Sequence, residues 1–337
     1  MNWLRKNVGS WEALLLVLLV LVMILGSSLS PYFLSFSNFS LMASDVMEKA
    51  IMALAMTLII VAGEIDLSVA SILGLASVVL GVCVRAGLPI GLGMLLVLVL
   101  GACAGLLNGA AVTRLGLPSL VVTLGTLGLY RGLAYVVLGD QAVSDFPVAF
   151  TNFGFGVVPG TLIPWTVLVF IVLALVFVVI LHWSSFGRRI YAVGNNKEAA
   201  RFSGIRVDRL KLTLFVISGA IAALAGILFT ARFASARADN AVGFELDVVT
   251  IVLLGGVNIF GGRGSLVGVI LSLIIIAMLH NALGLANISG DIQNTVIGVL
   301  LIFSVLGPNL AQRIQATITR RRLKGATGAR APVAPSH

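Results

Sequence analysis

Long apolar runs, separated by short polar or glycine-rich segments, fill most of the sequence. A helix needs about 20 apolar residues to cross the hydrocarbon core of a bilayer. Ten segments reach or approach this length, although the eighth is short on its own. The predicted spans are Trp11–Leu29, Val46–Ala62, Val69–Val84, Leu92–Val112, Pro118–Leu138, Leu162–Leu181, Leu212–Ala231, Val248–Val257, Leu266–Leu285 and Ile292–Leu306. The sequence therefore predicts an all-α, polytopic membrane protein of about ten transmembrane helices.

The composition supports this assignment. Hydrophobic residues make up 59% of the chain and charged residues only 10%, whereas a soluble domain carries about 25% charged residues. The mean hydropathy of +1.11 agrees. The net charge of +9 does not indicate nucleic-acid binding, because the basic residues lie between apolar runs rather than on one folded face. We expect membrane lipid, and no nucleic acid, around this chain.

The basic residues are distributed unevenly between the two sides of the predicted membrane. Ten spans place both termini on the same side of the membrane. If that side is the cytoplasm, 17 Lys and Arg lie in inner segments, 4 in outer segments and one, Arg131, within a span. Inner loops of membrane proteins carry an excess of Lys and Arg. The segment 139–159 contains neither residue, as expected of an outer loop. Both termini are therefore predicted to be cytoplasmic.

Motifs for metal or nucleotide binding do not stand out. Cys83 and Cys103 lie in apolar runs, the three histidines are scattered, and the sequence contains no phosphate-binding GxxxxGK[ST] motif. We expect no catalytic residue, no metal and no cofactor held by this chain itself.

The ends of the chain differ from its middle. We predict a transmembrane domain at 1–312 and a basic C-terminal tail at 313–337, whose end is small, Pro-rich and expected to be disordered. The first span has some features of a cleaved signal peptide, because Arg5 and Lys6 precede it. A retained signal anchor fits better, since nine further apolar segments follow.

A basic island at residues 184–211 carries seven Lys and Arg. Asn196 suits a helix N-cap, Glu198 lies in the first turn that would follow, and Gly204 suits a left-handed stop. These signals predict a helix of about two turns over Lys197–Ser203. The residues alone leave two interpretations open: an interfacial helix that contacts anionic lipid head groups, or a docking helix for a cytoplasmic partner.

Two segments interrupt helices in a similar way. Gly63–Ser71 and Gly256–Ser265 each follow an apolar run, begin with glycine, offer polar residues and resume at a Ser-x-x-Gly motif. We interpret them as a divergent internal repeat. Interrupted helices in corresponding positions point to the pathway of a transporter, because non-helical backbone at membrane depth must be buried in protein or line a wet cavity.

Residues in or near these breaks are the candidates for a translocation pathway. They are Gly63, Glu64, Asp66, Ser68, Asn108, Thr123, Arg131, Gly256 and Asn258. Glu64 and Asp66 either hydrogen-bond a solute, brace the first break, or are ordinary loop carboxylates near lipid head groups. Arg131 costs at least about 2.5 kcal/mol inside a span, so it gates, braces helices or contacts the solute. The neutral polar side chains line the path or bond neighbouring helices.

Four ordered motifs resemble one family. They are "GEIDLSVASILG" (Gly63–Gly74), "PSLVVTLGTLGLYRGLAYVV" (Pro118–Val137), "GRRIYAVGNNKEAARFSGI" (Gly187–Ile205) and "VLLGGVNIFGGRGSLVG" (Val252–Gly268). In this order, over almost the whole chain, they resemble the permease subunits of ribose-type sugar ABC importers. The stretch "FASARADNAVGFELDVVTIVLLGGVNIFGGRGSLVG" is similar to the branch that takes up autoinducer-2 and rhamnose.

The basic island resembles the EAA loop of ABC importer permeases, whose short helix sits in a groove on the ATP-binding subunit. The resemblance implies a coupling set formed by Asn196, Glu198, Ala199, Ala200, Phe202 and Gly204. Two positions depart from the family pattern. Leu214-Phe215-Val216-Ile217 stands where Ile-x-Leu-Pro is usual, and Glu64 stands where a second glycine is usual.

The resemblance implies a transport subunit of the bacterial inner membrane rather than an enzyme. A separate cytoplasmic ATPase subunit would bind ATP and Mg, and a second permease, of the same or a different chain, would complete the path. A periplasmic binding protein would deliver a monosaccharide or sugar-like solute (rhamnose, autoinducer-2 or a ribose-like compound). The alternative is a secondary active transporter of a small polar solute. Proton coupling would need deep ionisable residues, which the spans lack apart from Arg131.

Overall fold

The computed structural model describes residues 10–300 and 302. In this part of the chain the regular structure is helical; strands are absent, and two isolated bridges join Val143 to Ala236 and Val157 to Pro164. The helices are α2 (Ser10–Leu29), α3 (Phe36–Val61), α4 (Val69–Arg85), α5 (Ile90–Arg114), α6 (Ser119–Leu138), α7 (Val148–Phe155), α8 (Trp165–Val178), the π-helix η1 (Val179–Trp183), α9 (Ser185–Asn195), α10 (Lys197–Phe202), α11 (Val207–Phe233), α12 (Phe244–Leu254) and α13 (Leu266–Leu285). Residues 290–300 are also helical. The predicted all-α class is confirmed.

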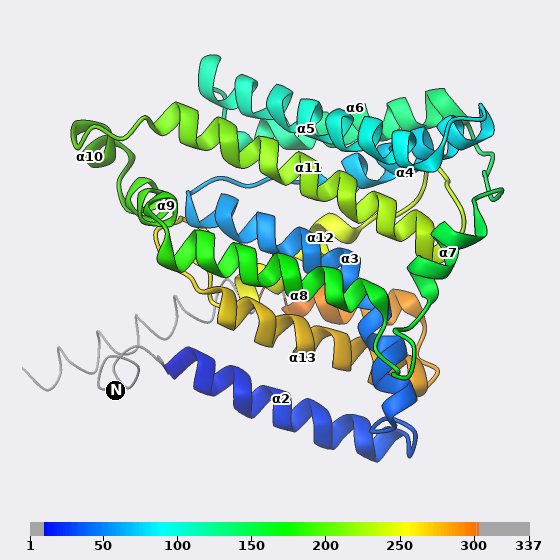
Figure 1. Ribbon diagram of the computed structural model, residues 1–337. Coiled ribbons are helices and arrows are strands. Elements are labelled where there is room, and N and C mark those ends of the chain that lie inside the picture. The colour runs from blue at the N-terminus through cyan, green and yellow to red at the C-terminus, as the bar shows by residue number, and fades with distance from the viewer. Residues whose placement is uncertain (1–9, 301, 303–337) are drawn as a thin grey trace, which may run out of the picture.

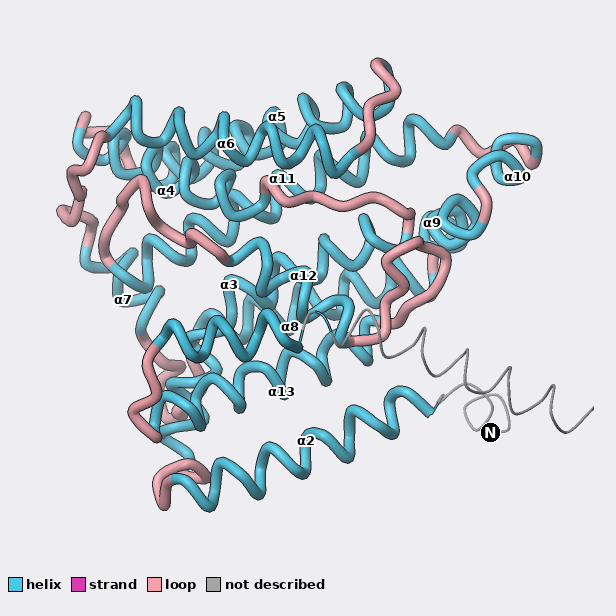
Figure 2. Tube along the Cα trace, turned by 180° about the vertical axis from the view of Figure 1, so that it is seen from behind, coloured by secondary structure: helices cyan, strands magenta, loops and turns pink. Residues whose placement is uncertain are grey.

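Most of the long helices lie side by side along one direction (Figures 1 and 2). Helices α9 and α10 lie at one end of the bundle, which we call the α10 end, and α7 lies at the opposite end, which we call the α7 end. Helix α11 packs against α3, α4 and α5, while α13 packs against α2, α3 and α12. The segments that connect the long helices therefore lie at one or the other of these two ends.

Helix α3 is the centre of the core. Every residue from Met47 to Val61 except Lys49 is buried, as expected of a helix that is surrounded on all faces. The contact between α5 and α11 is close because both helices carry glycine there. A Cβ at Gly105 would lie 2.1 Å from the carbonyl oxygen of Phe215, so small residues allow the two backbones to touch.

The predicted spans match helices, with differences in length. Within residues 10–300, six helices are long and apolar enough to cross a membrane, and α4 is a shorter apolar helix. Helix α12 has only 11 residues. The count of ten spans therefore stays a prediction. The end of the tenth span and the predicted tail at 313–337 lie outside the described residues.

Two boundaries differ from the sequence analysis. Helix α3 begins at Phe36, ten residues before the predicted span at Val46. The hydroxyl of Ser35 caps this earlier start by accepting a hydrogen bond from the N–H of Asn38 at 3.3 Å. The predicted outer loop at 139–159 contains helix α7, which packs against α11.

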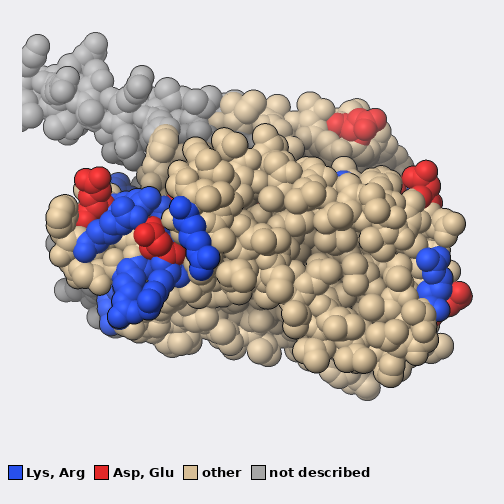
Figure 3. Space-filling model, turned by 90° about the horizontal axis from the view of Figure 1, so that it is seen from above, with Lys and Arg blue, Asp and Glu red and all other residues tan. Residues whose placement is uncertain are grey.

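Charge is distributed differently at the two ends. At the α10 end, exposed basic residues gather on one face of the molecule (Figure 3); they are Arg188, Arg189, Lys197, Arg201, Arg206 and Arg209. Among the described residues, only Arg201 of this set has an acidic partner, Asp208 at 2.8 Å. At the α7 end, three cations are paired with acids, in Lys49–Asp247, Arg232–Glu48 and Arg237–Asp239, while Arg85 donates to Gln141 Oε1. The unbalanced positive charge therefore belongs to the α10 end.

Candidate functional site

Helix α10 is a separate, well-capped turn at the tip of the α10 end. Asn196 ends α9, and its side-chain oxygen accepts hydrogen bonds from the N–H groups of Glu198 at 3.0 Å and Ala199 at 2.9 Å. This is the geometry of an N-cap. The predicted helix over Lys197–Ser203 is confirmed, with Ser203 as its C-cap.

Gly204 ends this helix in the left-handed region, with φ of +81°. The N–H of Gly204 donates to Arg201 O at 2.9 Å, and the next N–H, of Ile205, donates to Ala200 O at 3.0 Å. Such a stop favours glycine, which has no Cβ to clash. Ala200 is buried against the bundle, whereas the Phe202 ring is 92% exposed. Helix α10 thus holds an aromatic side chain outward.

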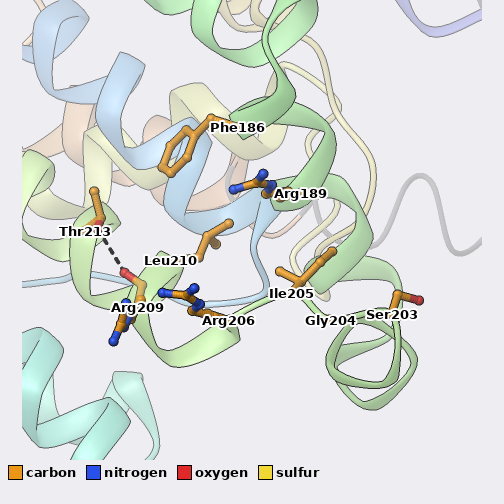
Figure 4. A pocket seen from close by; sticks show the side chains of 9 residues that line it. All are labelled: Phe186, Arg189, Ser203, Gly204, Ile205, Arg206, Arg209, Leu210 and Thr213. Carbon is orange, nitrogen blue, oxygen red and sulfur yellow. Dashed lines mark hydrogen bonds between the residues drawn. The ribbon is translucent and has the colours of Figure 1, made fainter.

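A pocket of about 570 Å³ lies beside α10, between α9 and the start of α11. Its walls combine three guanidinium groups, Arg189, Arg206 and Arg209, with the apolar side chains of Phe186 and Leu210. Figure 4 shows Arg189 on α9 across the pocket from Arg206 and Leu210. The α10 end therefore presents both positive charge and apolar surface to whatever lies next to it.

Helix α9 connects this segment to both predicted breaks. At Gly194 a Cβ would lie 1.9 Å from the oxygen of Val61 and 2.4 Å from the nitrogen of Gly262. The N–H of Gly262 donates to the same Val61 oxygen at 2.8 Å. In addition, the Tyr191 hydroxyl donates to Gly264 O at 2.7 Å; burial raises the pKa of Tyr191 to about 12, so the hydroxyl keeps its proton at neutral pH. We call this contact the glycine junction.

The first break, Gly63–Ser68, is held by a buried carboxylate. Gly63 lies in the left-handed region with φ of +81°. Asp66 is fully buried; one of its oxygens accepts from the N–H and hydroxyl of Ser68, at 3.0 and 2.6 Å. Its other oxygen accepts from the Ser218 hydroxyl on α11 at 2.8 Å. Asp66 therefore binds the start of α4 to α11.

Three further polar residues extend this arrangement. The Asn108 amide on α5 donates to the Ser68 hydroxyl at 2.8 Å, and the Tyr130 hydroxyl donates to Asn108 Oδ1 at 3.2 Å. The Thr123 hydroxyl on α6 shares its hydrogen between Ser119 O at 2.9 Å and Ile65 O in the first break at 3.3 Å. Asp66, Ser68, Asn108 and Thr123 are each 0% exposed. Their placement favours the interpretation in which they brace the break.

Glu64 forms an ion pair with Lys211, and both side chains are mostly buried. Lys211 stands near the start of α11 and is the last residue of the basic island. The positive charge of Lys211, more than burial, lowers the pKa of Lys197 on α10. Glu64 therefore offsets part of the positive charge at the α10 end and connects the first break to the segment that follows α10.

Arg131 follows Tyr130 on α6, and its guanidinium reaches the first turn of α4, just past the first break. Its guanidinium donates to Ala238 O at 2.6 Å, Asn240 O at 2.7 Å and Ala70 O at 3.2 Å. Three carbonyl acceptors satisfy the buried charge and fix the loop between α11 and α12 against α4. Arg131 is thus brought into a bracing contact that includes Ala70, two residues after Ser68.

The second break, Gly255–Ser265, is longer and held mainly by backbone contacts. Gly256 has φ of +86°. The Asn258 side chain accepts from the N–H of Phe260 at 2.9 Å, so it shapes its own loop. The Phe260 ring is 78% exposed. The two serines of the predicted repeat are not equivalent, because Ser265 caps α13 whereas Ser71 lies inside α4, which Ser68 precedes.

Sequence reasoning missed several residues that matter to this arrangement. Tyr191 and Gly194 on α9 join the two breaks, Lys211 neutralises Glu64, and Ser218 holds Asp66. The lone Lys within an apolar α11 was an available signal for a buried ion pair. Tyr191 and Gly194 stand in the third family-like motif, whereas Ser218 had no signal, because serine is common in membrane helices.

The comparisons with known proteins agree with this geometry. A protein-family profile described as the permease component of the branched-chain amino acid transport system matches residues 38–305. The chain is 34% identical over 320 residues to the autoinducer 2 import system permease protein LsrD of Escherichia coli K12, covering 92% of this chain and 96% of the relative. The same protein of Shigella flexneri gives the same values, and that of Escherichia coli O157:H7 is 33% identical. No solved structure matches.

Both the family match and the identity extend over most of the chain, so they cover α10, the two breaks and the bracing residues together. The resemblance inferred from the four motifs is confirmed. The chain belongs to this family of transport-system permease components, as a ribose-type ABC importer permease similar to the autoinducer-2 import permeases.

Proposed function

We propose that this chain is the membrane-spanning subunit through which an ABC importer moves a monosaccharide or sugar-like solute across the bacterial inner membrane. Autoinducer-2, a ribose-like sugar and rhamnose are the solutes to test. The observation that carries the proposal is the 34% identity over 92% of the chain to autoinducer-2 import permeases. ATP and Mg are bound by a separate ATPase subunit, and a periplasmic binding protein delivers the solute.

In this proposal, α10 is the docking element for the ATPase. The support is geometric: α10 is capped at both ends, projects from the bundle, and holds the Phe202 ring 92% exposed beside a basic, partly apolar pocket. An exposed aromatic side chain at the tip of a rigid element is a typical anchor at an interface. Movement of α10 then reaches the second break through α9 and the glycine junction.

The proposal also includes ten spans, cytoplasmic termini and a second permease. The unbalanced positive charge at the α10 end supports an inward orientation of that end. The second permease, identical or different, packs against this one so that the breaks flank a shared path. The bracing network then holds the shape of the path, and the solute itself meets a few neutral groups and backbone carbonyls.

Reconstitution tests the transport proposal. The complex, isolated from its native host through a tag on this chain, is placed in proteoliposomes with the binding protein and radiolabelled autoinducer-2, D-ribose or L-rhamnose. We expect uptake of one of them that depends on ATP. Uptake that proceeds without ATP and follows an ion gradient would instead establish the secondary transporter.

The docking role is tested with two exposed residues. Phe202→Ala and Glu198→Ala should lower ATP-driven uptake about tenfold or more, as loss of an interface anchor does. Leu115→Ala is the matched control, because Leu115 is 71% exposed at the same end of the bundle. All three should keep the wild-type unfolding temperature. Full uptake and ATPase coupling in both α10 variants would remove α10 from the docking interface.

A further inference from the structure

A second pocket, with mostly apolar walls that include a few polar and charged side chains, lies at the α7 end, far from α10. It has a volume of about 290 Å³ and lies between α3, α12, α13 and the helix at 290–300. This volume holds roughly ten water molecules, since each takes about 30 Å³ in the liquid, and a pentose or hexose ring fits in the same space. A neighbouring cavity of about 140 Å³ shares Lys49 and His280 with it.

The walls of this pocket carry both donors and acceptors without net charge. Lys49 Nζ lies 2.5 Å from Asp247 Oδ2 and 4.3 Å from the centroid of the Phe244 ring. Both charged side chains are mostly buried, at 17% and 14% exposure. Asn294 adds an exposed amide on the opposite wall. A neutral ligand with several hydroxyl groups suits such walls better than an ion, because the two buried charges already neutralise each other.

His280 lines this pocket and carries a ring nitrogen without a hydrogen-bond partner among the described residues. Its Nδ1 lies 3.1 Å from Gln293 Oε1, so one ring nitrogen is occupied. Its Nε2 is buried and has no hydrogen-bond partner among the described residues. A buried polar atom without a partner is costly unless something else satisfies it, and His280 lines both cavities. A hydroxyl of a ligand is suited to this role.

Helix α12 connects this pocket to the second break. Asp247 and Phe244 lie in the first turn of α12. Helix α12 has 11 residues and ends at Leu254. The second break begins at the next residue, Gly255, and continues to the glycine junction with α9. A solute held at this pocket therefore contacts the start of α12, and the other end of α12 leads into the second break.

We propose that this pocket is an entry site for the neutral, polyhydroxylated solute at the α7 end, formed by Lys49, Asp247, His280, Asn294 and the Phe244 ring. The inference rests on the proposed function and deepens it, because it gives the solute a place in this chain before the breaks. The site is separate from the bracing network around Asp66.

Thiol protection tests this site without transport. Asn294→Cys is made in the intact complex after Cys83→Ser and Cys103→Ser, and its reaction with a hydrophilic maleimide is timed with millimolar autoinducer-2, D-ribose or L-rhamnose. Asn152→Cys on α7 is the control, an exposed asparagine at the same end. We expect one of these compounds to slow labelling of Asn294→Cys alone. Equal labelling rates with all three compounds would overturn the proposal.

Uptake distinguishes this inference from the proposed function. His280→Phe and Asn294→Leu should lower ATP-driven uptake about tenfold, equivalent to about 1.4 kcal/mol, while the loaded binding protein still stimulates ATP hydrolysis. His280→Gln, which keeps hydrogen-bonding groups, should restore part of the uptake, and Asn152→Leu should change nothing. Wild-type uptake in both pocket variants would exclude the entry site and leave the permease function intact. A wild-type complex without ATP-driven uptake would instead contradict the proposed function.

Discussion

The two interrupted segments share a sequence pattern but are held in different ways. The first break, Gly63–Ser68, is fixed by side chains: Asp66 accepts three hydrogen bonds and is fully buried. The second break, Gly255–Ser265, is fixed mainly by its own backbone turns and by α9. We infer that the first break is a static joint of the core, whereas the second follows the position of α9, although α9 also contacts Val61 beside the first break.

This difference teaches that a repeat pattern does not determine the role of each copy. The side chains that reach a break from elsewhere in the fold decide whether it can move. Ser218, which holds the first break, is 152 residues away from Asp66 in the sequence. Tyr191, which contacts the second break, stands only a few residues before α10. We infer that the second break transmits the motion of the coupling segment.

The largest effect is expected at the glycine junction. Gly194→Ala would place a Cβ 1.9 Å from the Val61 oxygen, so the backbones must separate, at a cost of about 2 kcal/mol. ATP-driven uptake should fall below about a tenth of the wild-type rate, since the contact that links α9 to both breaks is opened. Gly125→Ala on α6 is the matched control, because a Cβ there meets nothing within 4 Å. Normal uptake by Gly194→Ala would mean that the junction does not carry the coupling.

An effect of similar size is expected at the static joint. Asp66→Leu leaves the N–H and hydroxyl of Ser68 and the hydroxyl of Ser218 without their acceptor, at a cost of about 1–3 kcal/mol for a buried group. The unfolding temperature of the purified protein should fall and uptake should be lost. Asp66→Asn keeps an acceptor oxygen and should retain part of both. If the two variants unfold at the same temperature, these hydrogen bonds do not hold the first break.

A smaller effect is expected where the second break contacts α9. Tyr191→Phe removes the hydrogen bond to Gly264 O, which is worth about 1 kcal/mol. Uptake should fall by about fivefold, while the unfolding temperature changes little because the ring still packs. A variant that loses stability rather than uptake would indicate that Tyr191 has a packing role.

The smallest effect is expected on the exposed side of the second break. Phe260→Ser changes a ring that is 78% exposed, so the stability of the purified protein should stay within about 0.5 kcal/mol of wild type. In contrast, Ser68→Ala in the first break should cost about 1–2 kcal/mol, because it removes a buried hydroxyl that both donates and accepts. If Phe260→Ser and Ser68→Ala were equally stable in thermal unfolding, the claim that buried side chains hold only the first break would be wrong.

Local features of this chain were predictable from sequence. The cap at Asn196 and the stop at Gly204 depend only on residues within a few positions of each other, so the pattern of residues was sufficient. The apolar runs likewise predicted the positions of the long helices, because a helix that crosses the bilayer must have enough apolar residues to span its hydrocarbon core. The short α12 was visible as a weak span for the same reason.

Long-range contacts were not predictable in this way. The candidate pathway residues Asp66, Ser68 and Asn108 were selected because they are polar, but their burial depends on how α4, α5 and α11 pack. The close approach of Gly194 to Val61 depends on three segments meeting at one point. No spacing within any one of those segments indicates the other two.

Hydrogen–deuterium exchange in the assembled complex tests the comparison most directly. The complex is measured without nucleotide and with a non-hydrolysable ATP analogue, and exchange is compared in peptides that cover 63–68 and 255–265. We predict that exchange at 255–265 changes with nucleotide, together with α9 and α10, while exchange at 63–68 stays the same. A nucleotide response confined to 63–68, or equal responses in both segments, would contradict the account of one static and one moving break.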